Sequence, residues 1–152
     1  MNDDVRHEHS PPTTAPHQAK NRLIQMEQSL NLLEAGDPVS ALTLAGAAEE
    51  ILGRIAERKG KEPRVEYLAA WSSSLFEWAG KPRPSKKELI RLENRTKNEL
   101  KHQDDGRNVS VEADFTFDAE DMLLRCMYNH FNAFACYPQS KRLRSWFENM
   151  TL

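Results

Sequence analysis

A segment that mixes small and large apolar residues, between Asp37 and Gly60, constrains the fold of this 152-residue chain most strongly. Asp37 followed by Pro38 predicts a helix start, because an aspartate accepts a hydrogen bond from the first turn and proline fits the first helical positions. Alanine and glycine mix with leucine and isoleucine along the segment, which suits a central helix that its neighbours approach closely on more than one side. We therefore expect an all-α protein that packs around this helix.

Further segments repeat apolar residues at the spacing of a helix, and cap or turn signals bound them. Gly36 is a stop signal for the first of these helices. Ser85 and Glu88 form a capping box for the fourth, and Asp118 caps the fifth. The expected helices span residues 15–35, 37–60, 65–79, 85–102 and 118–137, and a short last helix follows within residues 140–150.

The third of these helices, residues 65–79, is rich in aromatic side chains. Aromatic residues at helical spacing belong to a core far more often than to a ligand site, so we expect Tyr67, Trp71 and Trp78 to be buried. Trp146 and Phe147 in the last helix are expected to pack back onto the core or to meet a partner.

Two segments lack a helical pattern. Residues 108–117 alternate apolar and polar side chains, which predicts an extended crossover that pairs locally or between subunits. Residues 1–16 have little apolar mass and three prolines, so we expect a disordered arm, followed by a single domain over residues 17–152. His7 and His9 in this arm have no preorganised geometry, and no metal site is expected there.

Charge and composition exclude several classes of protein. The net charge is −2 and the pI is about 6.2, so a nucleic-acid contact would need a local patch rather than a global cationic field. The longest apolar run is too short to cross a bilayer, so no membrane contact is expected. Two cysteines, Cys126 and Cys136, imply no disulfide framework, and the expected location is the reducing cytoplasm.

Some residues with chemical potential have a simpler structural interpretation. Glu49 and Glu50 lie inside the apolar second helix, where we expect one to be solvated and the other to pair with an arginine or lysine. A di-metal site is disfavoured, because the chain has no Glu-x-x-His motif. Cys126 and Cys136 are expected to be buried, inert thiols, and His130 a satisfied histidine at the core or its edge.

A polar stripe on the fourth expected helix is the main candidate site. Arg95, Asn98 and His102 share one face of a continuous helix, and Arg91, Lys97 and Lys101 add positive charge around it. An imidazole transfers protons near neutral pH, a guanidinium holds phosphate, and an amide orients a reacting group. These groups suffice to cleave RNA through its own 2′-hydroxyl without a metal or cofactor. Basic residues at a helix end also complement the helix dipole, which is the non-catalytic alternative.

The segment RTKNELKH, from Arg95 to His102, resembles the signature of the HEPN superfamily, an arginine followed after about four to six residues by a histidine at a helix end. The sequence LAGAAEEILG in the second helix is also similar to members of that family. The resemblance covers roughly residues 15–137. It implies an up-and-down bundle of four to five helices, and the alternating pattern of residues 108–117 places an extended crossover before the last long helix of that bundle. The resemblance also implies a metal-independent endoribonuclease whose two motifs form a composite site in a homodimer.

In that interpretation His102 is the general acid or base, Arg95 stabilises charge on the phosphate and Asn98 positions the site. Arg91, Lys97 and Lys101 would bind substrate. Six residues separate Arg95 from His102, but a second register places Lys97 at the family's arginine position, with Asn98 as the polar residue after it. In a continuous helix Lys97 points away from His102, which favours Arg95.

Two alternatives from other classes remain open. One is a non-catalytic HEPN-like module that binds a nucleotide, RNA or an inhibitory protein partner. The other is a helical interaction protein whose interface is formed by the aromatic third helix with Trp146 and Phe147. An apolar patch without a cleft near His102 would favour this last alternative.

Overall fold

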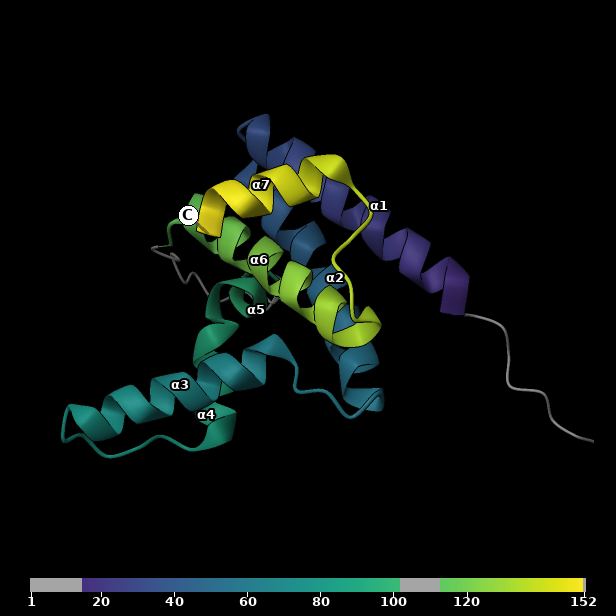
Figure 1. The fold of residues 1–152 in the computed structure, drawn as a ribbon. Helices are drawn as coiled ribbons and strands as arrows, with labels where there is room; N and C mark the ends of the chain where they lie inside the picture. Colours follow the sequence, from purple (N-terminus) through teal and green to yellow (C-terminus); the bar gives the residue numbers. More distant parts are fainter. Residues whose placement is uncertain (1–14, 102–112, 152) are drawn as a thin grey trace, which may run out of the picture.

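The computed structural model of the chain describes residues 15–101 and 113–151 (Figure 1). Over these residues the protein is all-α, which confirms the predicted class. The helices are α1 (Ala15–Glu34), α2 (Pro38–Arg58), α3 (Arg64–Trp78), α4 (Lys86–Glu93), α5 (Arg95–Lys101), α6 (Phe115–Phe134) and α7 (Lys141–Thr151). No helix in the described ranges is both long enough and apolar enough for a bilayer crossing.

Helix α2 is the centre of the fold, as its composition predicts. It lies between α1 and α6, and its small residues Ala41, Ala45 and Ala48 are fully buried. Alanine at these positions lets the neighbouring backbones come close, while Leu42 and Leu52 fill the space between them. The main core therefore consists of α1, α2 and α6.

The predicted helix-end signals operate as expected. Asp37 Oδ1 accepts a hydrogen bond from the Ser40 amide at 3.1 Å, and Gly36 takes a positive φ of 80° at the turn before it. At the start of α4, Ser85 and Glu88 make both hydrogen bonds of a capping box. Local sequence therefore fixes the start of α2 and the start of α4.

The start of α6 differs from the prediction. Asp114 rather than Asp118 caps this helix, with its Oδ1 accepting from the Phe117 amide at 3.1 Å. Phe115 and Phe117, predicted to be extended, are therefore helical. The alternating pattern misled because Phe117 is an exposed residue of the first helical turn and not part of a strand face. The remainder of the predicted crossover, residues 108–112, lies outside the described residues, as do residues 1–14 of the predicted arm.

Two peripheral parts flank the core. Helix α7 packs back onto it as predicted, with Leu143 buried and with Trp146 and Phe147 partly buried against the core. Helices α3 and α4 form a hairpin that extends to one side of the α1–α2–α6 core (Figure 1). Each helix of this hairpin has one buried residue, Ala69 in α3 and Leu89 in α4.

Candidate functional site

The expected polar stripe is divided between two helices. Helix α4 ends at Glu93 and α5 begins at Arg95, with Asn94 between them at φ −105° and ψ 10°. The prediction of one continuous helix through Arg91 and Arg95 is therefore wrong. Arg125 of α6 contacts this break, and its guanidinium donates to the Glu93 carbonyl at 3.0 Å and to Asn94 Oδ1 at 2.6 Å. These bonds stabilise polar groups that the break in the helix exposes.

The predicted site residues lie in different environments. Arg95 is on the surface, where its Nε donates to Glu99 Oε1 at 2.9 Å, and this contact raises the pKa of Arg95. Asn98 is half-buried one turn further along α5, and Arg91 is exposed near the end of α4. Lys101 is the last residue of α5, and the described side chains do not include it. His102 lies outside the described residues.

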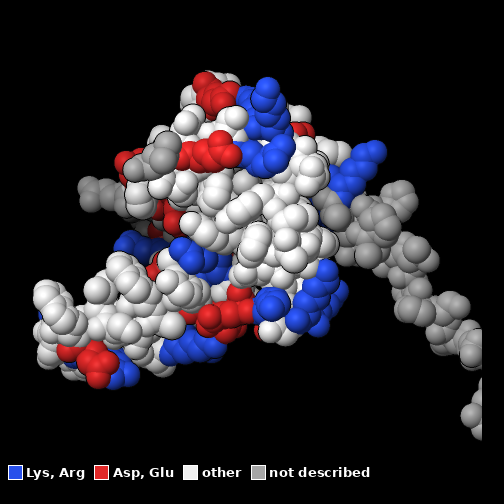
Figure 2. Space-filling model, in the orientation of Figure 1, with Lys and Arg blue, Asp and Glu red and all other residues white. Residues whose placement is uncertain are grey.

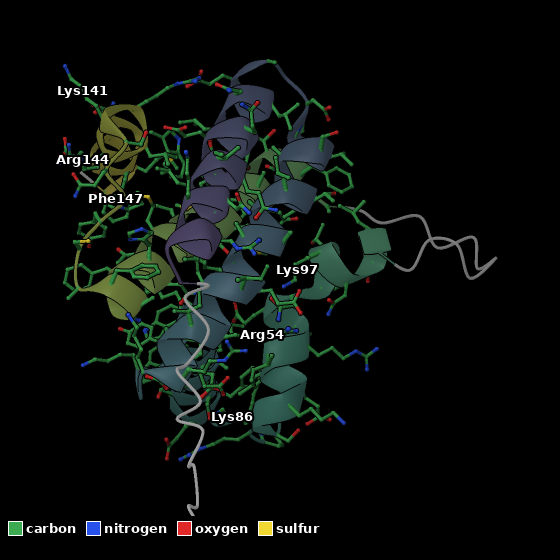
Figure 3. All side chains as sticks on the ribbon, turned by 90° about the vertical axis from the view of Figure 1, so that its right-hand side faces the viewer. Arg54, Lys86, Lys97, Lys141, Arg144 and Phe147 are labelled. Carbon is green, nitrogen blue, oxygen red and sulfur yellow. The ribbon has the colours of Figure 1, made fainter. Side chains whose placement is uncertain are left out.

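Lys97 points into the molecule. Its side chain is 7% exposed and its Nζ lies 3.5 Å from Glu49 Oε2 of α2. In Figure 3 it lies among the helices, whereas Lys141 on α7 extends away from them. The alkyl part of Lys97 lies against Gly46, where an added Cβ would come within 2.6 Å of the Lys97 Cδ. Lys97 is therefore part of the protein interior, and its ammonium does not face the solvent, where it would have to bind the phosphate of a substrate.

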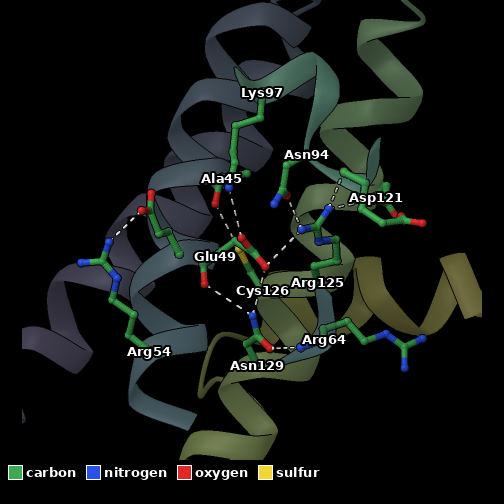
Figure 4. A network of polar contacts seen from close by, with 12 residues as sticks. Ala45, Glu49, Arg54, Arg64, Asn94, Lys97, Asp121, Arg125, Cys126 and Asn129 are labelled. Atoms are coloured by element: carbon green, nitrogen blue, oxygen red, sulfur yellow. Dashed lines mark hydrogen bonds and ion pairs between the residues drawn. The ribbon is translucent and has the colours of Figure 1, made fainter. Parts of the chain in front are cut away.

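Glu49 is the centre of a buried polar network (Figure 4). Its carboxylate lies 3.3 Å from Arg125 Nη2, in addition to the contact with Lys97. Asn129 of α6 donates its Nδ2 to both the backbone and side-chain oxygens of Glu49 at 3.4 Å, and its Oδ1 accepts from the Arg64 amide at 2.7 Å. The network therefore joins α2, α5 and α6 to the start of α3 and, through Arg125, to Asn94 between α4 and α5.

The prediction of one paired and one solvated glutamate in α2 is confirmed in part. Glu49 is buried and paired with Arg125 and Lys97, whereas Glu50 is nearer the surface but is also paired, with its Oε1 2.8 Å from Arg54 Nη2. Sequence reasoning missed Arg125 and Asn129. Both interrupt an apolar helix at a spacing of four residues, on the same face as Met122 and Cys126, which are buried. A cation and an amide on the apolar face of a core helix are the sequence signal of a buried network.

A small hollow lies beside this network, between α2, α4, α5 and α6. Its volume is about 60 Å³, and Arg95, Glu93, Asp118 and Asp121 contribute to its lining. Burial raises the pKa of Asp121, and Arg125 partly opposes this shift. A hollow of this volume is smaller by several fold than the roughly 300 Å³ that organic ligands occupy. Its lining is also mixed in charge, so it is not a preformed nucleotide pocket.

Cys126, Cys136 and His130 were the remaining candidates for chemistry in the sequence. Cys126 is buried with its Sγ 3.3 Å from the Ala45 carbonyl, and burial raises its pKa, as suits the inert thiol predicted. Cys136 is exposed, so the prediction of its burial is wrong; it lies beyond the end of α6. His130 Nδ1 is 2.8 Å from the Cys136 carbonyl, and burial lowers its pKa. Within the described ranges no three histidine, cysteine or carboxylate side chains are grouped as a metal would require.

The aromatic face of α3 is exposed, contrary to the prediction that it belongs to the core. The exposed fractions are 49% for Tyr67, 57% for Trp71 and 88% for Trp78. The opposite face, with Ala69 buried, packs on α4. The helical spacing was interpreted correctly, but α3 is apolar on two faces and α4 covers only one of them. Figure 2 shows the resulting arm with mainly uncharged side chains on the face in view.

The exposed face, which we call the α3 strip, comprises Tyr67, Ala70, Trp71, Ser74, Leu75 and Trp78. These positions fall within a sector of roughly 140° around the helix, and none of them is charged. Exposed tryptophans grouped on one helix face are typical of a protein contact surface. No protein-family model matches the chain, and no curated protein or solved structure is significantly similar to it.

Proposed function

We propose that the protein is a helical interaction module that binds another protein chain through the α3 strip. The observation that carries the proposal is the exposure of two tryptophans, Trp71 and Trp78, on one uncharged face of a helix. Tryptophan and tyrosine are the residues most enriched among those that dominate protein–protein binding energies. Exposing them to water is unfavourable, and a partner that covers them removes that cost.

The position of the strip supports this function. The α3–α4 hairpin uses the other face of α3 for its own packing, with Ser72 Oγ donating to Glu93 Oε1 at 2.8 Å across the two helices. The core of α1, α2 and α6 is formed without the strip. Tyr67 contacts the rest of the fold through the Arg64 guanidinium, which lies over its ring at 4.4 Å. The remainder of the strip is outside the core, so binding a partner there leaves the fold intact.

Site-directed photo-crosslinking tests the proposal. We would place p-benzoylphenylalanine at position 67, which keeps an aromatic ring in the strip, and irradiate cells that produce the full chain. A discrete crosslinked protein product is expected from position 67. The matched control carries the same group at position 145, since Ser145 is exposed on α7, away from the strip. Equal yields from both positions, or no product from position 67, would reject the interaction surface.

Arg95 supports a second candidate function. We infer, as this second candidate, that the chain forms a HEPN-like bundle of four to five helices. This bundle would cleave RNA without a metal, at a composite site in a homodimer. Arg95 supports it because its guanidinium is exposed, with Asn98 one turn away on α5, and His102 follows the last residue of α5 in the sequence. Lys97 has no part in this version, since its charge pairs with Glu49. Arg91 and Lys101 remain the proposed phosphate-binding residues. The non-catalytic version binds nucleotide or RNA with the same groups and does not cleave.

RNA cleavage in the presence of EDTA tests this candidate. His102→Ala is expected to abolish cleavage. Arg95→Lys should lower it on the order of a hundredfold, because lysine lacks the bidentate fork that stabilises charge on phosphate. Arg54→Lys is the matched control, as Arg54 is also exposed and paired four residues away. RNA binding without cleavage in the wild type would select the non-catalytic module, and equal activity of all variants would reject both versions.

A further inference from the structure

The residues of the α3 strip are arranged symmetrically about the middle of the helix. Tyr67 and Trp78 are equally distant from the point between Ser72 and Ser73, as are Ala70 and Leu75. Trp71 and Ser74 form the third such pair, closest to the midpoint. If two identical helices lie antiparallel about a twofold axis at this point, each member of a pair faces the other member on the second copy.

The sizes within these pairs are complementary. Trp71 faces the small Ser74 of the second copy, and Leu75 faces the small Ala70, so large side chains enter spaces left by small ones. The outer pair brings Tyr67 beside Trp78, where two aromatic rings favour stacking or edge contacts. The Ser74 hydroxyl already donates to the Ala70 carbonyl at 3.2 Å, so its burial leaves no hydrogen-bond donor unsatisfied.

The charges around the strip do not require a charged partner. Glu66 pairs with Lys86 at 2.6 Å near one end of α3. Glu77 pairs with Arg83 near the other end. Both carboxylates are therefore paired within the chain, and the Arg64 guanidinium at the start of α3 lies over the Tyr67 and Tyr128 rings. The uncharged strip is best met by another uncharged strip, because no unpaired carboxylate is then removed from water.

The area of the strip fits a modest dimer. From the exposed fractions of its four large side chains, it offers roughly 500 Å² of apolar surface per copy. Two copies then bury about 1,000 Å², which lies at the lower limit for a specific interface and suits an association in the micromolar range. The undescribed segments are poor candidates to cover it, since residues 1–14 and 102–112 are dominated by polar and charged side chains.

We therefore propose that the partner of the α3 strip is a second copy of this chain, bound antiparallel about a twofold axis between Ser72 and Ser73. This inference rests on the proposed function and specifies its partner. The strip of one copy then covers that of the other, forming a two-helix layer backed on each side by α4.

A pair of charge variants tests both the partner and the register. Sedimentation of the full-length wild type is expected to show dimers at concentrations up to roughly 100 µM. Ala70→Glu and Leu75→Lys should each weaken self-association on the order of a hundredfold, because each places an unpaired charge inside the interface. Mixing the two variants should restore a heterodimer, detected by native mass spectrometry. In that heterodimer the two introduced charges face each other, and the other Ala70–Leu75 pair is native.

Controls separate this inference from the proposed function. Ser145→Glu adds a charge on α7 and should leave the dimer unchanged, while circular dichroism checks that both strip variants fold. A wild-type dimer whose variants fail to recover on mixing would overturn the antiparallel register. A monomeric wild type that still crosslinks another protein from position 67 would overturn the second-copy partner and retain the interaction module. A monomer without crosslinks would reject both.

Discussion

The network around Glu49 and the α3 strip depart from the usual distribution of side chains in opposite directions. In the network, an arginine that is 1% exposed and a buried lysine lie inside the protein. In the strip, a tryptophan that is 88% exposed lies in water. The first departure is compensated by partners within the chain, since Glu49 and Asn94 pair with the buried cations and Asn129 donates a hydrogen bond to the Glu49 carboxylate. The second has no such compensation in the described residues, which is why we place the partner outside the chain.

The two regions meet at the base of the hairpin. Arg125 holds the Glu93 carbonyl and the Asn94 side chain, and Ser72 of α3 holds the Glu93 carboxylate. The network thus fixes the end of α4, where the hairpin joins the core. The α3 strip lies on the part of the hairpin that extends away from the core. Changes in the network should affect folding, whereas changes in the strip should affect association.

The largest effect is expected for Arg125→Leu. Removing this cation leaves the buried Glu49 carboxylate with the Lys97 ammonium and the Asn129 amide as its partners, and it leaves the Glu93 carbonyl and the Asn94 side chain without their donor. Breaking one side of a buried ion pair costs about 3–5 kcal/mol of unfolding free energy. Urea unfolding of the wild type and the variant measures this loss of unfolding free energy. The matched control is Arg54→Leu, which removes an exposed arginine from its pair with Glu50 and should cost less than about 0.5 kcal/mol. Equal losses for both arginines would show that the network does not stabilise the fold.

A smaller effect is expected from two glycines of α2. Gly46→Ala places a Cβ within 2.6 Å of the Lys97 Cδ, whose chain cannot easily move because its ammonium pairs with Glu49. Gly53→Ala is the control, because its Cβ would come no closer than 3.4 Å to Asn129. Both variants gain the same helix propensity, so overpacking at Lys97 should make them differ by about 1–3 kcal/mol in unfolding free energy. Indistinguishable stabilities would mean that Lys97 is not held in place.

Much of the fold could be predicted because its signals are local. Asp37 with Pro38, Gly36, and Ser85 with Glu88 act within one turn of the helix ends that they define. The central position of α2 followed from its small residues. The break at Asn94 could not be predicted in the same way, because Arg125, which stabilises it, is about thirty residues away in sequence and on another helix.

The site was harder to predict for the same physical reason. Helical spacing correctly placed Tyr67, Trp71 and Trp78 on one face of α3, but it could not show which neighbour covers that face. Lys97 was expected to bind substrate from its charge alone, and only the packing of α5 on α2 shows that it faces Glu49. Periodicity determines a face, whereas burial depends on the arrangement of helices distant in sequence.

Trp71→Gln should have a small effect on the isolated monomer. More than half of the Trp71 side chain is exposed, so the unfolding free energy should change by no more than about 0.5 kcal/mol. Association behaves differently, since a dimer stabilises the folded chain by mass action. The wild-type melting temperature should therefore rise with protein concentration, whereas that of the variant should not. A variant that loses several kcal/mol when dilute would show that Trp71 belongs to the core after all.

Asp121→Asn should have the smallest effect, at the border of the network. Burial raises the pKa of Asp121 above its ordinary value of 3.8, although Arg125 Nη1 lies 3.8 Å from its Oδ2 and opposes the shift. The folded protein therefore binds this proton more readily than the unfolded chain, so stability falls as the pH rises from 3.8 and the loss is complete above the raised pKa. Asparagine is uncharged throughout, so the variant should be slightly more stable than the wild type at pH 7, and the difference should disappear as the pH falls below 3.8.

The gain in stability of Asp121→Asn is small because 38% of the Asp121 side chain is exposed and solvent screens its charge. Urea unfolding at both pH values measures it. A loss of stability at neutral pH would instead mean that Asp121 supports Arg125, and that the network extends to the surface.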